Sequence, residues 1–269
     1  MFERLKRMFK EGDQIAAAAQ VPEGARVYAI GDIHGRRDLF ELMIEAIEKD
    51  DRTSAPAETT VILLGDLVDR GPDSAGVIQM ARDWQQHRRV RIIAGNHEEM
   101  FLSSFDDAET LRHFLRHGGR ETVLSFGVTP EVLKIATFEE VQAIMRQNVP
   151  AETREFLENL ENVIAIGDYL FVHAGIDPAR AIEDQSVETL RWIREPFLSH
   201  TEPHGPVVVH GHSITKNVED RGNRIGIDTG AYASGRLTAL ILEGTRRRYL
   251  ETSRSEDGTF TARALPIAA

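Results

Sequence analysis

The first hundred residues repeat one pattern three times, and this repetition restricts the possible folds more than any other feature of the chain. Short runs rich in branched apolar residues alternate with stretches of helical periodicity near residues 38–49 and 74–87. The three apolar runs read "RVYAI", "TVILL" and "VRIIA". Strands that alternate with helices in this way form β-α-β units with parallel strands and right-handed crossovers. The sequence therefore predicts an α/β fold whose first three strands are parallel.

The rest of the chain divides into two parts. Residues 97–160 read as successive helices, broken at "HGGR", "FGVTP" and "NVPAE". From residue 162 apolar runs return, and the close spacing of the later ones predicts antiparallel pairing. We expect one domain over residues 25–250 that carries this helical insert. We also expect an N-terminal extension, 1–24, that is helical or frayed, and a C-terminal tail, 251–269, in which one more edge hairpin could form.

Each of the first three predicted strands is followed by a glycine and then by a residue with a side-chain oxygen. These residues are Asp32 in "GDIHG", Asp66 in "GDLVDRG" and Asn96 in "GNHEE", about one β-α-β unit apart. Because the carboxyl ends of parallel strands meet at the same edge of a sheet, we expect the three side chains to converge. Two carboxylates in one small volume repel each other unless a positive charge lies between them. The sequence therefore predicts a metal-ion site at this edge.

Histidines end two of the later predicted strands. His173 lies in "LFVHAG", and "VVVHGHS" offers His210 or His212. The chain contains no cysteine, and a ligand set of oxygen and nitrogen atoms suits Mn, Fe or Zn. A single Gly-Asp pair is usually a turn, and we interpret Asp168 in "AIGDYL" in that way. Five fragments of this kind, in order and at strand ends, would be a rare accident without a metal site.

Composition limits the possible partners and the compartment. The net charge of −11 argues against a general nucleic-acid-binding protein, which needs a basic face. No apolar run approaches the length of a transmembrane helix, and the basic start "MFERLKRMFKEGD" lacks the continuous apolar stretch of a secretory signal. We therefore expect a cytoplasmic protein that has neither a nucleic-acid partner nor a transmembrane segment.

The motifs "GDIHG", "GDLVDRG", "GNHE", "HAG" and "GHS" resemble the signature of the PPP-family metallophosphoesterases, which have the calcineurin-like fold. "GNHEEMF", "HGGRE" and "IDTGAYASGRLTAL" resemble more closely the bacterial and phage serine/threonine protein phosphatases of lambda type. The resemblance covers about residues 26–243. It implies two mixed β-sheets sandwiched between helices, with a dinuclear metal site at the sheet edge.

The resemblance also implies which residues bind two divalent metal ions, with Mn as the first choice and Fe or Zn as alternatives. The first ion is assigned to Asp32, His34 and Asp66, and the second to Asp66, Asn96, His173 and His212. His212 fits the family pattern better than His210, which we interpret as a buried or supporting histidine. Asp228 in "GIDTGA" is expected to orient a metal-bound histidine. Two such ions would attract phosphate and activate a bridging water for direct attack on phosphorus.

Four further roles follow from the resemblance. His97 matches the general acid of the family, and Asp69 matches the carboxylate that keeps its imidazole protonated. Arg70 can donate two hydrogen bonds to a phosphate group. Arg194 in "LRWIREPF" resembles a second phosphate-binding arginine, and Arg191 is its competitor because the surrounding residues depart from the family pattern.

These roles predict a serine/threonine protein phosphatase whose substrate is a phosphorylated protein, a phosphopeptide or a small phosphate ester. One alternative is a diadenosine tetraphosphate hydrolase, which carries the same metal motifs but expels a phosphate that needs no proton. In that type of enzyme the position of Asp69 commonly resembles alanine, so the aspartate favours a phosphatase. The other alternative is a non-catalytic metal-binding module, but such a module would not need His97, Asp69 and Arg70.

Overall fold

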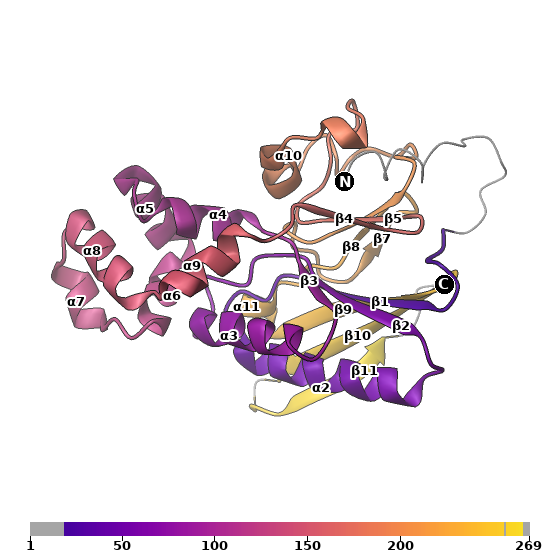
Figure 1. Cartoon of the computed structure of the whole chain (residues 1–269), viewed down its shortest axis with the longest axis horizontal. Helices are drawn as coiled ribbons and strands as arrows, with labels where there is room; N and C mark the ends of the chain where they lie inside the picture. Colours follow the sequence, from indigo (N-terminus) through magenta and orange to yellow (C-terminus); the bar gives the residue numbers. More distant parts are fainter. Residues whose placement is uncertain (1–18, 256, 266–269) are drawn as a thin grey trace.

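Two β-sheets lie face to face, and helices cover their outer faces (Figure 1). The structure is a computed structural model that describes residues 19–255 and 257–265. The first sheet has the order β11-β10-β9-β1-β2-β3. Its strands are β1 (Ala25–Ile30), β2 (Glu58–Leu63), β3 (Val90–Ile92), β9 (Arg236–Glu243), β10 (Arg246–Arg254) and β11 (Phe260–Leu265). The second sheet has the order β4-β5-β6-β8-β7. Its strands are β4 (Val163–Ile166), β5 (Tyr169–Val172), β6 (Val207–His210), β7 (Glu219–Asp220) and β8 (Arg224–Gly226).

The β-α-β pattern predicted for the first hundred residues is confirmed. β1, β2 and β3 are parallel neighbours, joined by α2 (Arg37–Thr53) and α3 (Ser74–Gln85). Side chains of β1 alternate between the two faces of the sheet, as a period of two requires. Tyr28 and Ile30 belong to the core on the helical face, whereas Val27 and Ala29 belong to the core between the sheets. A strand buried on both faces explains why "RVYAI" is apolar throughout.

The antiparallel pairing predicted for the later strands is only partly correct. β4 pairs antiparallel with β5, and β9 pairs antiparallel with β10. The prediction is wrong for β6 and β8, which pair in parallel; β6 also pairs in parallel with β5. The connection from β5 to β6 contains the 3-10 turn η2 (Ile182–Asp184) and α10 (Val187–Trp192), and it supplies the crossover that parallel strands need. Apolar runs mark strands but do not show the direction in which they pair.

The helical insert extends away from the sheets toward one end of the molecule (Figure 1). Its elements are α4 (Asn96–Ser103), α5 (Ala108–Phe114), the π-helical turn η1 (Leu115–Gly119), α6 (Arg120–Ser125), α7 (Pro130–Ile135), α8 (Phe138–Asn148) and α9 (Ala151–Glu158). Its buried side chains join the core on the helical face of the first sheet. The insert is therefore continuous with the core.

The two ends of the described chain both join the first sheet. Val21 is buried, and its N–H donates to the Gly244 carbonyl at 3.1 Å. Residues 1–18 of the expected N-terminal extension lie outside the described residues. At the other end β10 and β11 form a hairpin, so the sheet reaches Leu265, beyond residue 250 where the sequence suggested a boundary. β11 is an edge strand with mainly exposed side chains, which explains its weak apolar signal.

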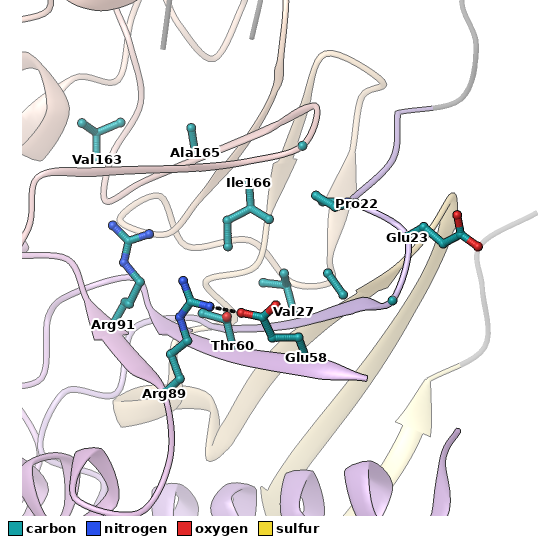
Figure 2. A pocket seen from close by; sticks show the side chains of 13 residues that line it. Pro22, Glu23, Val27, Glu58, Thr60, Arg89, Arg91, Val163, Ala165 and Ile166 are labelled. Carbon is teal, nitrogen blue, oxygen red and sulfur yellow. Dashed lines mark hydrogen bonds and ion pairs between the residues drawn. The ribbon is translucent and has the colours of Figure 1, made fainter. Parts of the chain in front are cut away.

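A groove of about 770 Å³ opens between the two sheets, where β1, β2 and β3 begin (Figure 2). Val27, Val163 and Ile166 line it, together with Arg89, which is paired with Glu58. This groove lies at the opposite end of the strands from the predicted metal site. Within the described chain, no helix combines the length and the apolar character that crossing a membrane requires.

Candidate metal centre

The loops after β1 and β2 are fastened together at the carboxyl edge of the first sheet. The N–H of His34 donates to the Asp66 carbonyl at 2.7 Å, and the N–H of Gly35 donates to the Leu67 carbonyl at 2.9 Å. Gly95, after β3, has no room for a side chain because a Cβ atom would collide with the Asp66 carboxylate. The glycines that precede the polar residues therefore allow a close approach of the loops.

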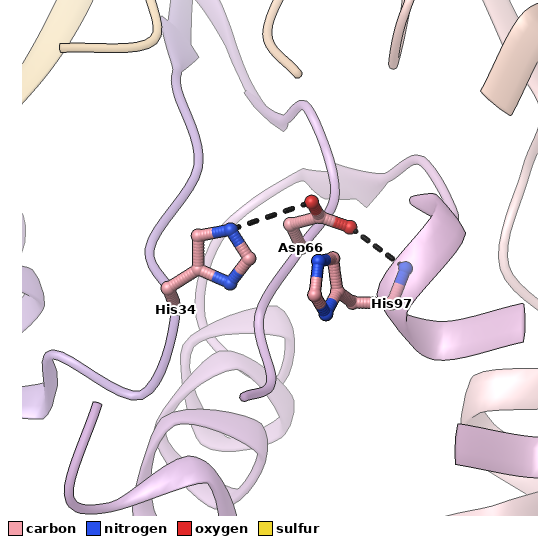
Figure 3. Close-up of side chains that lie close together, drawn as sticks. All are labelled: His34, Asp66 and His97. Carbon is pink, nitrogen blue, oxygen red and sulfur yellow. Dashed lines mark hydrogen bonds and ion pairs between the residues drawn. The ribbon is translucent and has the colours of Figure 1, made fainter. Parts of the chain in front are cut away.

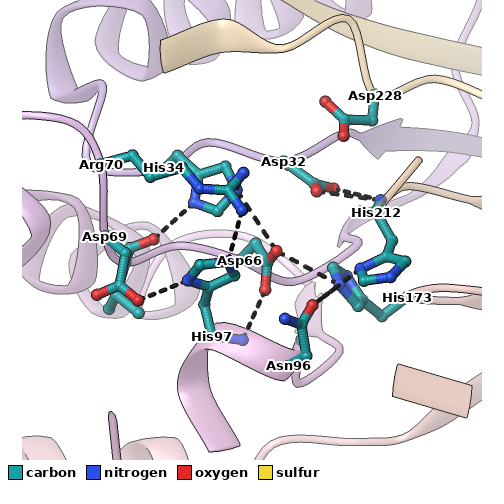
Figure 4. Close-up of polar contacts among 12 residues, drawn as sticks. Asp32, His34, Asp66, Asp69, Arg70, Asn96, His97, His173, His212 and Asp228 are labelled. Carbon is teal, nitrogen blue, oxygen red and sulfur yellow. Dashed lines mark hydrogen bonds and ion pairs between the residues drawn. The ribbon is translucent and has the colours of Figure 1, made fainter. Parts of the chain in front are cut away.

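The six predicted metal ligands lie together at this edge, around Asp66 (Figure 4). The Nε2 atoms of His34 and His173 lie 3.5 and 3.4 Å from Asp66 Oδ2. The side-chain oxygen of Asn96 lies 3.0 Å from His173 Nε2 and 2.9 Å from His212 Nδ1. Asp66 can therefore serve two neighbouring ions, as the resemblance implies.

Two groups of side chains could each hold an ion. Within each group, the potential ligand atoms lie within 4.8 Å of one another. The groups are His34, Asp66 and His97 (Figure 3), and Asp66, His173 and His212. Asp32 belongs to neither group. Its carboxylate accepts the N–H of His212, at 3.0 Å from Oδ2, and it lies at the edge of the cluster. His97, expected as the acid, belongs to the first group, and the expected ligand Asp32 does not.

The electrostatics of the cluster favour a divalent cation. Asp32, Asp66 and Asp228 are almost completely buried, and burial raises the pKa of all three carboxyl groups, to about 6 for Asp66. Burial also lowers the pKa of His173 to about 3 and that of His212 well below its usual range, so both imidazoles are neutral and can act as ligands. His212 Nε2 and Asp228 Oδ2 are buried without a hydrogen-bond partner. Crowded carboxylates, neutral imidazoles and unpartnered atoms therefore fit the metal ions that the fold implies.

The backbone is left-handed at several of these residues. In the described chain, positive φ angles outside glycine occur at His34 (47°), Asp66 (49°), Asp69 (73°), Arg70 (68°) and His212 (61°). The left-handed region is unfavourable for residues that carry a Cβ atom, by about 1 kcal/mol or more each. All five were predicted as site residues, and strained backbone of this kind concentrates at functional sites.

Glu98 is a site residue that the sequence analysis missed. Its carboxylate accepts the N–H groups of Gly95 (2.8 Å), Asp66 (2.9 Å), Leu67 (2.7 Å) and Val68 (3.3 Å). Glu98 thereby ties the loop after β2 to the start of α4. Burial raises the pKa of Glu98 to about 7, and the amide groups of Gly95 and Leu67 act in the opposite direction. An acidic residue in the first helical turn after "GN" was the available signal.

His97 and Asp69 form a buried pair, with 2.5 Å between Nδ1 and Oδ2. The Thr122 hydroxyl donates to the other oxygen of Asp69 at 2.6 Å and thus fixes the carboxylate. Burial raises the pKa of Asp69 and lowers that of His97. Asp69 therefore holds the Nδ1 side of the imidazole in place. His97 Nε2 then faces the cluster and can carry a proton to or from it.

Of the candidate arginines, Arg70 lies directly at the cluster, whereas Arg191 is held by other side chains. The guanidinium of Arg70 lies 2.9 Å from the Nε2 atoms of His34 and His97. Burial is the main cause of the lowered pKa of His212, and the charge of the exposed Arg194 lowers that pKa further. Arg191 also lies near the cluster, but its guanidinium is bound to Glu99 and Asn162.

Three other residues lie apart from the proposed ligand roles. His210 is buried, its ring lies 3.0 Å from the Gly211 carbonyl, and it belongs to neither potential metal group. Asp228 was expected to orient a metal-bound histidine, but its side chain instead lies against Asp32 and accepts the N–H of Gly230. Asp168 lies in the turn between β4 and β5, as interpreted from the sequence.

A family model described as calcineurin-like phosphoesterase matches residues 25–235. The serine/threonine-protein phosphatase 1 of Salmonella typhimurium is 25% identical over 237 residues, covering 86% of this chain and 98% of the relative. A symmetrical bis(5'-nucleosyl)-tetraphosphatase of Baumannia cicadellinicola is 27% identical over 267 residues, covering 80% and 89%. The structure of a cold-active protein tyrosine phosphatase superposes with a TM-score of 0.59 at 17% identity, covering 93% of this chain and 81% of that one, which supports the fold alone.

Proposed function

From the premise that this chain belongs to the calcineurin-like phosphoesterase family, we propose that it hydrolyses phosphoserine and phosphothreonine esters in proteins or peptides. The observation that carries the proposal is the contact of 2.5 Å between His97 and Asp69, directly beside the metal cluster. A general acid with a carboxylate partner is needed to expel an alkoxide, which leaves poorly without a proton. Relatives named as protein phosphatases and relatives named as nucleosyl tetraphosphatases both match the chain, so the leaving group must be argued from the site.

The proposed cofactors are two divalent ions, with Mn as the first choice and Fe or Zn as alternatives. Six residues would hold them: Asp32, His34, Asp66, Asn96, His173 and His212. When bound, such ions neutralise phosphate charge and lower the pKa of a coordinated water, which supplies the attacking oxygen.

The protein groups then position the phosphate and move the proton. The fork of Arg70 faces the cluster and can donate two hydrogen bonds to phosphate oxygens. Arg194 is the proposed second phosphate-binding arginine. In this structure the Arg70 guanidinium lies 2.9 Å from His97 Nε2. Once a phosphate takes up the hydrogen bonds of Arg70, His97 Nε2 is free to hold a proton and deliver it to the leaving oxygen of the serine or threonine. Asp69 holds Nδ1 and stabilises the charged imidazole, so the ring keeps one orientation.

The second candidate is hydrolysis of diadenosine tetraphosphate, and the name of the Baumannia relative favours it. The retained Asp69 argues against it because a phosphate leaving group needs little help from an acid. The deciding experiment compares kcat/KM for a phosphoserine peptide, diadenosine tetraphosphate and small monoesters with the same Mn-loaded preparation. A preference for the dinucleotide of more than about tenfold over every monoester would overturn the proposal.

Metal dependence separates an enzyme of this type from other possibilities. Removal of bound metal with a chelator should abolish hydrolysis of p-nitrophenyl phosphate, and added Mn should restore it. Full activity of protein shown to be metal-free would contradict the dinuclear site. Bound metal without hydrolysis of any phosphate ester would instead indicate a non-catalytic metal-binding module.

A further inference from the structure

Arg70 brings a positive charge to the metal centre, and contacts other than ion pairs hold its side chain in place. In the described chain, no carboxylate forms a salt bridge with its guanidinium, which lies 2.9 Å from the Nε2 atoms of His34 and His97 (Figure 4). Its stem runs along Gly118, where an added Cβ atom would come within 2.5 Å of Arg70 Cγ. Its N–H donates to the Gly118 carbonyl at 3.0 Å. The helical insert thus fixes the aliphatic part of the Arg70 side chain, and another contact must orient the guanidinium.

Tyr232 provides that second contact. Its ring centroid lies 4.7 Å from Arg70 Cζ, with the guanidinium over the ring, and 5.4 Å from the His34 ring in an edge-on arrangement. Tyr232 lies on the short helix α11 (Ala231–Ser234), which follows the loop after β8. The Ala231 carbonyl accepts a hydrogen bond from the buried Arg36 side chain at 2.7 Å, which anchors α11. The tyrosine therefore reaches Arg70 from an element that carries none of the six ligands.

We propose that Tyr232 is a positioning residue for phosphate binding that acts through Arg70. The aromatic face attracts the guanidinium and restricts its rotation, so both N–H groups of the fork stay directed at the centre. A flexible arginine would lose more conformational entropy on binding an anion than one that is held in advance. The contacts of Tyr232 with Arg70 and His34 are both made by its ring, so we assign the effect to the aromatic face. This inference rests on the proposed function for the role of Arg70.

The test compares four variants with the wild type: Tyr232→Leu, Tyr232→Phe, Arg70→Ala and the double variant Arg70→Ala/Tyr232→Leu. Leucine fills similar space without an aromatic face, and phenylalanine retains the face without the hydroxyl. Binding of inorganic phosphate is measured by calorimetry on Mn-loaded protein, together with metal content and with kcat and KM for p-nitrophenyl phosphate. Tyr232→Leu should weaken phosphate binding and raise KM by about five- to tenfold. Tyr232→Phe should stay within about twofold of the wild type.

The double variant separates action through Arg70 from independent packing. If Tyr232 acts through Arg70, the leucine change should add nothing further once the arginine is absent. The inference is overturned if the two losses add, if Tyr232→Leu binds phosphate like the wild type, or if it loses metal because His34 is disturbed. A wild type that binds phosphate in this Tyr232-dependent way but hydrolyses no ester would support the inference while the proposed function fails. A wild type that does not bind phosphate would overturn both.

Discussion

Replacing Asp69 by asparagine should slow the hydrolysis of phosphoserine peptides far more than that of p-nitrophenyl phosphate. Asp69 is fully buried, and its Oδ2 atom lies 2.5 Å from His97 Nδ1. Asparagine has nearly the same shape and can still accept a hydrogen bond from the imidazole. The change therefore removes the negative charge and preserves the position of the ring.

The size of the effect follows from replacing a charged hydrogen-bond acceptor of His97 by a neutral one. A hydrogen bond to a charged group contributes about 1.5–3 kcal/mol, and a neutral one about 0.5–1.5 kcal/mol. The protonated form of His97 therefore loses about 1–2 kcal/mol, which predicts a decrease in kcat of about five- to thirtyfold on a poor leaving group. Replacing His97 itself by asparagine should lower kcat further, by up to the roughly 10²–10⁴-fold that general acid catalysis contributes. The loss should lie near the upper end of that range for alkyl phosphates, whose leaving groups are poor.

The pH dependence of activity is an independent test, because it predicts the direction in which the pKa of His97 shifts in Asp69→Asn. Burial already lowers the pKa of His97, and removal of the carboxylate lowers it further. Since the acid must be protonated, activity falls as the pH rises through this pKa, and the alkaline limb of the profile should move to lower pH in Asp69→Asn. The assay measures kcat for both substrates across the neutral range, with metal content as the control. Equal losses on both substrates at full metal occupancy, or an unmoved alkaline limb, would refute the assigned role.

Three further changes test the surrounding structure. Asp66→Asn should bind less Mn than the wild type, because Asp66 belongs to both potential metal groups; equal metal content by elemental analysis would contradict its bridging role. Glu98→Gln should lower the free energy of unfolding by at least about 1–3 kcal/mol, since the side-chain NH2 of glutamine would replace an oxygen that accepts two backbone N–H groups and leave both unpaired. An unchanged urea midpoint would argue against this. Burial lowers the pKa of His204 from 6.5 to about 4. As the pH falls between these values, the unfolded chain binds a proton at His204 before the folded chain does, so the free energy of unfolding falls. His204→Gln should show a smaller loss of unfolding free energy over that interval.

The metal ligands were accessible from the sequence because geometry links them to strand ends. Asp32, Asp66 and Asn96 each follow a glycine after an apolar run, and parallel pairing brings such positions together without further information. Glu98 was missed because its role depends on four amide groups in two separate loops, and none of them leaves a trace in residue type. Tyr232 is similar, since its contact with Arg70 joins α11 to the loop after β2.

Strand direction in the second sheet could not be read from the sequence for a related reason. The runs that form β5 and β6 are short and apolar, and β8 has only three residues; such short runs fit parallel and antiparallel neighbours equally well. The pairing follows from the path of the connection through η2 and α10, which packs Leu190 and Phe197 against the outer face of the sheet. Tertiary packing, and not local periodicity, decides the topology there.

The left-handed backbone at His34, Asp66 and three neighbouring positions implies that this chain carries an internal opposition between folding and activity. Each of these conformations disfavours the native state, and the buried carboxylates beside them repel one another when no cation is bound between them. Inactivating substitutions should therefore fall into two groups with opposite effects on thermal tolerance. Changes such as Glu98→Gln weaken the native state, whereas a glycine at a left-handed position or an amide in place of Asp228 relieves it. Some inactive variants of the metal-free chain should consequently melt at higher temperatures than the functional parent, and selection for thermal stability alone would tend to remove the site.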